Sequence, residues 1–62
     1  MIIRKTPNNP NSYIIVDDIK TNIILQENNF NPKYMDYEYF YYCVSDKIIE
    51  FIKKEGLKCK NM

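Results

Sequence analysis

Two pairs of closely spaced carboxylates are the residues of this sequence whose types and spacing could most directly do chemistry. Asp17 and Asp18 are neighbours behind an apolar run, and Asp36 and Glu38 lie two residues apart. On a continuous strand the second pair would share one face and could bind a divalent cation. The first pair is explained more simply as the start of a helix, and exposed carboxylates often only solubilise a strand. The sequence therefore predicts no metal site.

The remaining residue types argue against catalysis. The chain has no His, which is the commonest general base and zinc ligand, and its single Gly excludes a glycine-rich phosphate loop. The two cysteines, Cys43 and Cys59, lie far apart and have no His to complete a tetrahedral metal centre. A chain this short also has little room for a substrate pocket. We therefore expect a protein that is not an enzyme and has no cofactor.

Size and charge narrow the class of protein further. The 62 residues include 9 basic and 8 acidic side chains, for a net charge of +1, and 45% are apolar. These figures favour one small globular domain over residues 1–62 and argue against a strongly electrostatic polyanion binder. No apolar run approaches the ~20 residues that span a bilayer, and no signal-peptide core is seen at the N-terminus. We expect a cytoplasmic protein with free thiols and no membrane association.

The strongest strand signal is the tyrosine-rich run at residues 37–44. Side chains alternate between the two faces of a strand, and Phe40, Tyr42 and Val44 align best with the helix that follows, so we assign them to the core. The other face would present an exposed tyrosine ladder with carboxylates at its rim, which is typical of a protein–protein interface. The predicted partner-binding residues are Tyr37, Tyr39, Tyr41, Asp36 and Glu38.

Alternatives remain open for this surface. Tyrosine also suits a half-exposed strand that has no partner, and a one-residue register shift would exchange the two faces. Aromatic side chains on a sheet can stack single-stranded bases, but the charges between these tyrosines are acidic. Nucleic-acid binding is therefore assigned to the basic helix at 46–55 and the tail behind it. Its candidate residues are Lys47, Lys53, Lys54 and Lys58.

Local signals predict two amphipathic helices. The first begins at Asp17–Asp18 and closes at Asn28–Asn29, where an Asn can adopt the left-handed conformation and Phe30 can pack back. The second begins after Ser45 and stops at Gly56. The apolar residues at helical spacing are Ile19, Ile23 and Ile24 in the first helix, and Ile48, Ile49, Phe51 and Ile52 in the second.

The strands lie before and between these helices. Residues 13–16 form an apolar β-branched run, residues 33–35 predict a short strand with a turn near Asp36, and 37–44 predicts the longest strand. The order is βαββα, an α+β fold with two helices on one face of a small three- to four-stranded sheet. The expected parts are an N-terminal arm or extra edge strand at 1–12, a core at 13–57 and a frayed basic tail at 58–62.

Three local motifs follow one another along the core. They are Asn29–Phe30 at a helix end, Phe40–Tyr42 in a hairpin, and Ser45–Asp46 at a helix start. In this the chain resembles a family of small, uncharacterised phage and mobile-element proteins. It departs from that family in having Asn29 where Gly is usual and in lacking an Ala-rich helix. The family has no agreed activity, so no functional residue is carried over. The resemblance implies a small accessory protein.

Three hypotheses follow for function. The first is a protein-binding accessory or inhibitor encoded by a phage or mobile element, with an anti-defence role (anti-CRISPR type) such as blocking a host nuclease complex. The second is a small nucleic-acid-binding regulator. The third is a homodimer formed through the tyrosine-rich strand or an exposed edge, which the marginal stability of so short a chain also favours.

Overall fold

The computed structural model describes residues 2–37 and 39–60, and within them an antiparallel sheet carries two helices. The strands β1 (Tyr13–Val16), β2 (Tyr34–Asp36) and β3 (Tyr39–Cys43) form this sheet in the order β1–β3–β2. Helix α1 (Ile19–Glu27) follows β1, helix α2 (Asp46–Glu55) follows β3, and a short 3₁₀ helix, η1 (Pro10–Ser12), precedes β1. The expected α+β class is confirmed.

The register divides the sheet into two unlike faces. Ile14 lies opposite Tyr42, and Tyr34 lies opposite Tyr41, so the members of each pair point to the same side. The helix face carries Ile14, Val16, Met35, Phe40 and Tyr42. The other face, which we call the tyrosine face, carries Tyr13, Ile15, Tyr34, Asp36, Tyr39, Tyr41 and Cys43.

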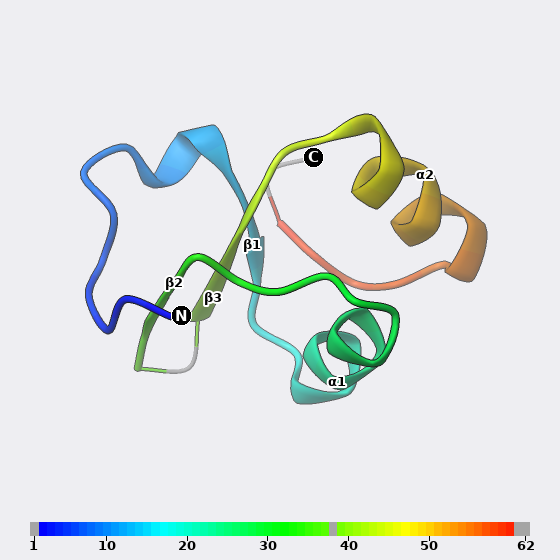
Figure 1. Ribbon diagram of the computed structural model, residues 1–62, viewed down its shortest axis with the longest axis horizontal. Coiled ribbons are helices and arrows are strands. Elements are labelled where there is room, and N and C mark those ends of the chain that lie inside the picture. The colour runs from blue at the N-terminus through cyan, green and yellow to red at the C-terminus, as the bar shows by residue number, and fades with distance from the viewer. Residues whose placement is uncertain (1, 38, 61–62) are drawn as a thin grey trace.

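Both helices lie on one side of the sheet, and the N-terminal arm lies on the other (Figure 1). The core between the sheet and the helices is apolar, and each aliphatic side chain buried there contributes roughly 1.5–3 kcal/mol. The rings of Phe30 and Phe51 join the segment behind α1 to α2, with 5.3 Å between their centroids. The buried core residues are Ile14, Val16, Leu25, Tyr42, Ile48 and Ile52.

Helix α1 does not bury the face that its isoleucine spacing predicts. Ile19 and Ile23 are 68% and 50% exposed, whereas Thr21 and Asn22 are buried. The reason is a hydrogen-bond partner from a distant strand: the hydroxyl of Tyr42 donates to Oδ1 of Asn22. A buried polar side chain needs such a partner, and this pair, together with the fully buried Leu25, turns the face of Thr21, Asn22 and Leu25 toward the sheet.

The predicted helix ends are confirmed. Asp18 and Ser45 accept hydrogen bonds from backbone N–H groups in the first turns of α1 and α2, at 3.0 and 3.3 Å. Asn29 and Gly56 adopt left-handed φ angles of 69° and 65° directly behind the two helices. The chain then folds back, and the N–H of Phe30 donates to a carbonyl of the last turn of α1 at 2.9 Å.

The terminal segments each add one bridge to an outer edge of the sheet. Ile3 bridges Tyr34 of β2 through backbone hydrogen bonds of 2.9 Å, and no strand forms within residues 2–12. Lys60 bridges Ile15 of β1 through hydrogen bonds of 3.1 and 2.7 Å. The expectation of a frayed tail is therefore wrong as far as Lys60, because the edge of β1 offers unpaired backbone groups to it.

Candidate functional site

The structure separates the three tyrosines of the predicted ladder. Tyr37 is 94% exposed and Tyr39 is 37% exposed, but Tyr41 is only 5% exposed. The ring of Tyr13 packs edge-on against Tyr41 with 6.5 Å between centroids, and the Tyr41 hydroxyl donates to Asp36. The prediction that Tyr41 belongs to an exposed ladder is therefore wrong, because the tyrosine face itself covers this side chain.

A turn at Tyr37 explains why its neighbours lie on other faces of the sheet than the sequence predicted. Strand β2 ends at Asp36, Tyr37 adopts a φ of 44°, and β3 begins at Tyr39. Alternation does not continue through a turn, so Asp36 lies on the same face as Tyr39, whereas a continuous strand would place them on opposite faces. The other predicted carboxylate, Glu38, lies outside the described residues.

The face predicted for the core is partly confirmed. Tyr42 is 1% exposed, and Phe40 packs against the core from the helix face. Val44, in contrast, is 53% exposed, because β3 ends at Cys43 and the chain there turns toward α2. The expectation that Val44 packs in the core is therefore wrong.

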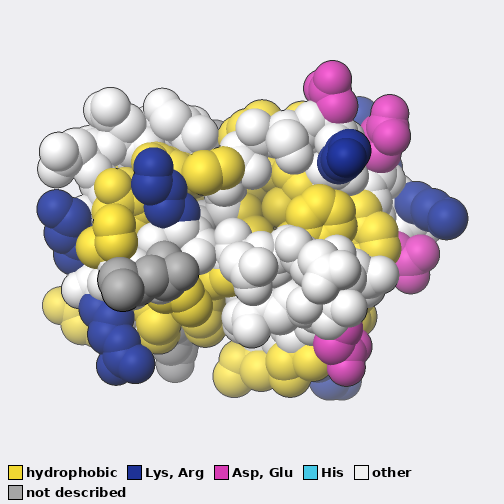
Figure 2. All heavy atoms as spheres, in the orientation of Figure 1, with side chains coloured by type: hydrophobic (Ala, Val, Ile, Leu, Met, Phe, Trp, Pro, Cys, Tyr) yellow, Lys and Arg dark blue, Asp and Glu magenta, His cyan; other side chains and the backbone are white. Residues whose placement is uncertain are grey.

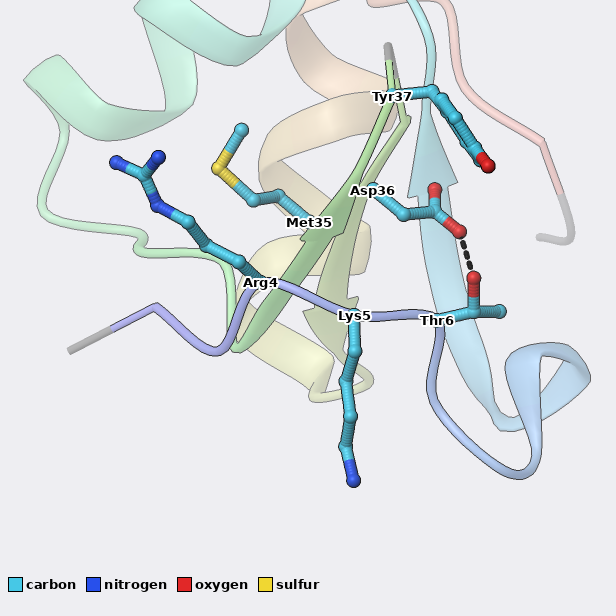
Figure 3. A pocket seen from close by; sticks show the side chains of 6 residues that line it. All are labelled: Arg4, Lys5, Thr6, Met35, Asp36 and Tyr37. Carbon is cyan, nitrogen blue, oxygen red and sulfur yellow. Dashed lines mark hydrogen bonds between the residues drawn. The ribbon is translucent and has the colours of Figure 1, made fainter.

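Asp36 is the polar centre of the tyrosine face. Its carboxylate oxygens accept the Tyr41 hydroxyl at 3.1 and 3.2 Å, and the Thr6 hydroxyl donates to Oδ2 (Figure 3). Burial, and then the hydrogen bond and charge of Asp36, raise the pKa of Tyr41 above its usual value. Asp36 thereby ties the N-terminal arm to the β2–β3 hairpin and keeps Tyr41 in its neutral form.

A shallow hollow of about 430 Å³ lies between the arm and the end of the hairpin (Figure 3). The arm contributes Arg4 and Lys5, whose side chains point in different directions and form no ion pair with a described residue. Tyr37 closes the far end of the hollow. The lining residues are Arg4, Lys5, Thr6, Met35, Asp36 and Tyr37.

A second hollow, of about 750 Å³, lies between the start of α1 and the hairpin. Ile19, which sequence reasoning placed in the core, contributes an exposed apolar side chain to it, and Phe40 contributes a half-buried one. Tyr37 lines both hollows. The lining residues are Asp17, Asp18, Ile19, Lys20, Tyr37, Phe40 and Lys58.

The lysines predicted for nucleic-acid binding do not share one uniformly basic surface. Lys47, Lys53 and Lys54 are exposed on α2, but Glu50 lies between them on the same helix. Figure 2 shows acidic side chains among the basic ones at the end of the molecule that carries α2. Lys58 lies elsewhere, in the lining of the second hollow. A phosphate chain along α2 would therefore meet repulsive as well as attractive charges.

Two lysines that sequence reasoning did not select lie over rings of the tyrosine face. The Nζ atom of Lys33 is 5.9 Å from the centroid of the Tyr34 ring, and that of Lys60 is 5.5 Å from the centroid of the Tyr39 ring. Lys60 also pairs with Asp17 at 3.3 Å. Lys33 is the sequence neighbour of its ring, but no local signal brings Lys60 to Tyr39, because the pairing depends on the bridge to β1.

The described residues show neither a metal-binding cluster nor a membrane-spanning helix. No group of three or more His, Cys, Asp or Glu side chains among them could hold a metal ion. No helix in this part of the chain is both long and apolar enough to cross a bilayer. Cys43 is exposed and Cys59 is half-buried, and burial raises the pKa of the Cys59 thiol.

Comparison of the chain with protein-family models, with curated proteins and with solved structures found no match. The resemblance to small phage and mobile-element proteins therefore stays a prediction from sequence motifs. The candidate site is defined by the geometry of this chain alone: two hollows that share Tyr37, and a tyrosine face flanked by cations.

Proposed function

We propose that this domain is a non-enzymatic protein-binding accessory or inhibitor. Its contact surface would be the hairpin-end surface, which we define as Ile19, Tyr37 and Phe40 together with the rim of the second hollow. The proposal keeps Tyr37 from the predicted ladder and leaves out Tyr41, which is buried. Tyr39 lies beside this surface, under the ammonium group of Lys60.

The observation that carries the proposal is the conformation of Tyr37. A bulky residue at a φ of 44° costs roughly 1–3 kcal/mol, which Gly would avoid and Asn would reduce. With 94% of the residue exposed, packing within the domain offsets little of this cost. A strained and exposed tyrosine therefore favours a role in recognition, and Tyr is among the residues most enriched at the energetic centres of interfaces.

The surroundings of Tyr37 have the composition of a recognition surface. Ile19 is 68% exposed and Phe40 is half-buried, so the second hollow has an apolar centre. Asp17 and Lys58 bring charges of both signs to its lining. An apolar centre with a polar rim is the usual arrangement of protein–protein interfaces, and the hollow is large enough to accept an aromatic side chain of a partner.

The setting of this function follows from the sequence motifs and the small size of the chain. A phage or mobile-element accessory that acts in the cytoplasm would use such a surface to cover part of a larger host protein. An anti-defence inhibitor that blocks a host nuclease complex is one form of this proposal, and it rests on analogy. A second copy of the chain is the partner in the homodimer form of the proposal.

Photo-crosslinking from position 37 tests the proposal. Benzoylphenylalanine in place of Tyr37 is expected to crosslink one dominant protein in nuclease-treated lysate of the source cells, while the same probe in place of Lys53 on α2 is not. A product of twice the monomer mass identifies a second copy. In competition, unlabelled wild-type protein is expected to suppress the crosslink, whereas the Tyr37→Gly variant, relieved of strain and still folded, does not. Equal suppression by the Tyr37→Gly variant would show that the ring is not used.

A further inference from the structure

The tyrosine face combines aromatic rings with cations that come from three separate parts of the chain. Tyr34 and Tyr39 belong to this face, and each has the Nζ atom of a lysine within 6 Å of its centroid, at 5.9 and 5.5 Å. The hairpin-end surface does not include these side chains. We define the basic–aromatic surface by Arg4, Lys5, Lys33, Tyr34, Tyr39 and Lys60.

We propose that the basic–aromatic surface binds single-stranded nucleic acid, with bases stacking on its tyrosine rings and phosphates contacting its cations. This function goes beyond the proposed protein contact and uses different residues. It also differs from binding along α2, since it places the nucleic acid beside the N-terminal arm, on the side of the sheet that faces away from both helices (Figure 1). Sheet faces with aromatic side chains are a common platform for single strands.

The two rings are placed for successive bases. Tyr34 lies opposite Tyr41, and Tyr39 lies two residues before Tyr41 on β3, so the two rings are diagonal neighbours on one face. The ring of Tyr13 packs edge-on against Tyr34 at 5.5 Å and an interplanar angle of 74°. This contact holds the Tyr34 ring in one orientation, which lowers the conformational entropy lost when a base stacks on it.

The lysines lie where a stacked nucleotide needs positive charge. A base on the Tyr34 or Tyr39 ring carries its phosphate within the reach of Lys33 or Lys60, because a lysine side chain turns about several bonds. Each ammonium group is already attracted to the electron-rich face of its ring. A base that stacks on the ring displaces the ammonium group toward the phosphate. The attraction between the ammonium group and the ring is then replaced by an attraction between the ammonium group and the phosphate.

The acidic residues that argued against nucleic acid on the tyrosine face each have a defined setting in the structure or lie outside the described residues. Asp36, which argued against a phosphate partner, is half-buried and accepts the hydroxyls of Tyr41 and Thr6, which orient its carboxylate without neutralising it. Asp17 and Lys60 form an ion pair at 3.3 Å, so each offsets part of the other's charge. Glu38, an acidic residue between Tyr37 and Tyr39 in the sequence, lies outside the described residues. In the view of Figure 2, basic side chains lie at the end of the molecule that carries the arm.

The N-terminal arm supplies the charge that the strands lack. Arg4 and Lys5 form no ion pair with a described residue. The arm is held beside the hairpin by the Ile3 bridge and by the bond from Thr6 to Asp36. Arg4 and Lys5 are thereby held beside the hairpin, where Arg4 points to the same side as Met35 and Lys5 points in a different direction (Figure 3).

Fluorescence anisotropy with labelled short oligo-dT and oligo-U at low salt tests the proposal. The Arg4→Glu/Lys5→Glu variant is expected to weaken binding about tenfold or more. Its control is the Lys53→Glu/Lys54→Glu variant on α2, which makes the same change in net charge and is expected to change affinity by less than about threefold. The logarithm of affinity should fall with the logarithm of salt concentration with a slope of about −2 to −3, as expected for three or four phosphate contacts.

Aromatic variants separate stacking from simple charge attraction. Tyr39→Leu is expected to weaken binding about tenfold, whereas Tyr37→Leu leaves it within about twofold. Circular dichroism checks that each variant is folded, and Tyr39→Phe, which keeps the ring, should restore binding. The proposal is overturned if the wild-type protein does not bind at low salt, if both charge reversals weaken binding equally, or if Tyr39→Leu binds like the wild type. None of these results bears on the Tyr37 crosslink, so the two proposals fail independently.

Discussion

The hydroxyl of Tyr41 donates to both carboxylate oxygens of Asp36, at 3.1 and 3.2 Å, between neighbouring strands of the sheet. The same carboxylate accepts the hydroxyl of Thr6, so one side chain joins the β2–β3 hairpin to the N-terminal arm. This arrangement makes Tyr41 a structural residue.

Removing the Tyr41 hydroxyl should destabilise the fold. A hydrogen bond to a charged group contributes roughly 1.5–3 kcal/mol, and because Asp36 is only half-buried we expect Tyr41→Phe to lower the free energy of unfolding by about 1–2 kcal/mol. Urea denaturation measures the change. Tyr39→Phe is the matched control, since the Tyr39 hydroxyl makes no hydrogen bond with a described residue and its loss should cost less than about 0.5 kcal/mol. Equal effects of the two variants would contradict this role for Asp36.

The buried Tyr42 predicts that stability falls at alkaline pH. Burial raises the pKa of Tyr42 from 10.0 to about 12, since the ionised form loses its hydration in the core. A pKa that is raised in the folded state means that this stabilisation is complete below pH 10 and is lost as the pH rises through the folded value. We expect the free energy of unfolding to fall by about 2–3 kcal/mol between pH 10 and pH 12 from this group.

Urea denaturation at several alkaline pH values measures this dependence. The Tyr42→Phe variant should lose the part of the slope of unfolding free energy against pH that Tyr42 causes. It is also less stable at neutral pH, because it leaves Asn22 without its partner. Tyr41, whose pKa is also raised, contributes in the same direction and accounts for part of the slope that remains. A slope unchanged by Tyr42→Phe would show that this hydroxyl is not buried in solution.

The two left-handed residues behind the helices should respond in opposite directions to substitution. At Gly56 an added Cβ would meet nothing within 4 Å, so Gly56→Ala should cost only the conformational penalty at a φ of 65°, about 1 kcal/mol. Asn29→Gly should raise stability by a few tenths of a kcal/mol, since a φ of 69° suits Gly better than Asn. Thermal unfolding should show the first as a fall of several degrees and the second as a small rise. Stabilisation by Gly56→Ala would contradict the left-handed conformation.

The features that the sequence predicted best are those that depend on neighbours along the chain. The caps at Asp18 and Ser45 and the left-handed end at Gly56 were read correctly, because each involves residues within a few positions of one another. The buried face of α2 was also correct, since Ile48 and Ile52 follow a clear helical period. These local signals were sufficient for the α+β class.

The two main errors have different physical causes. Alternation of side chains was carried through Tyr37, where a residue without the usual turn composition adopts a left-handed φ and resets the pattern. The isoleucines of α1 indicated the wrong face, because the hydrogen bond between Tyr42 and Asn22 favours the polar face. The reset at Tyr37 is a local conformation of the chain, whereas the interaction that orients α1 joins residues whose proximity depends on how the strands are paired.

By itself the sequence determined the helices, their ends, the approximate strands and the aromatic character of the candidate surface, because short-range geometry and residue type govern these properties. Only the tertiary structure decided which tyrosines are exposed and which charges surround them. The order β1–β3–β2 brings Lys60 to Tyr39 and Thr6 to Asp36. Such pairings join distant parts of the chain, and their free energy is gained only after the whole fold has closed.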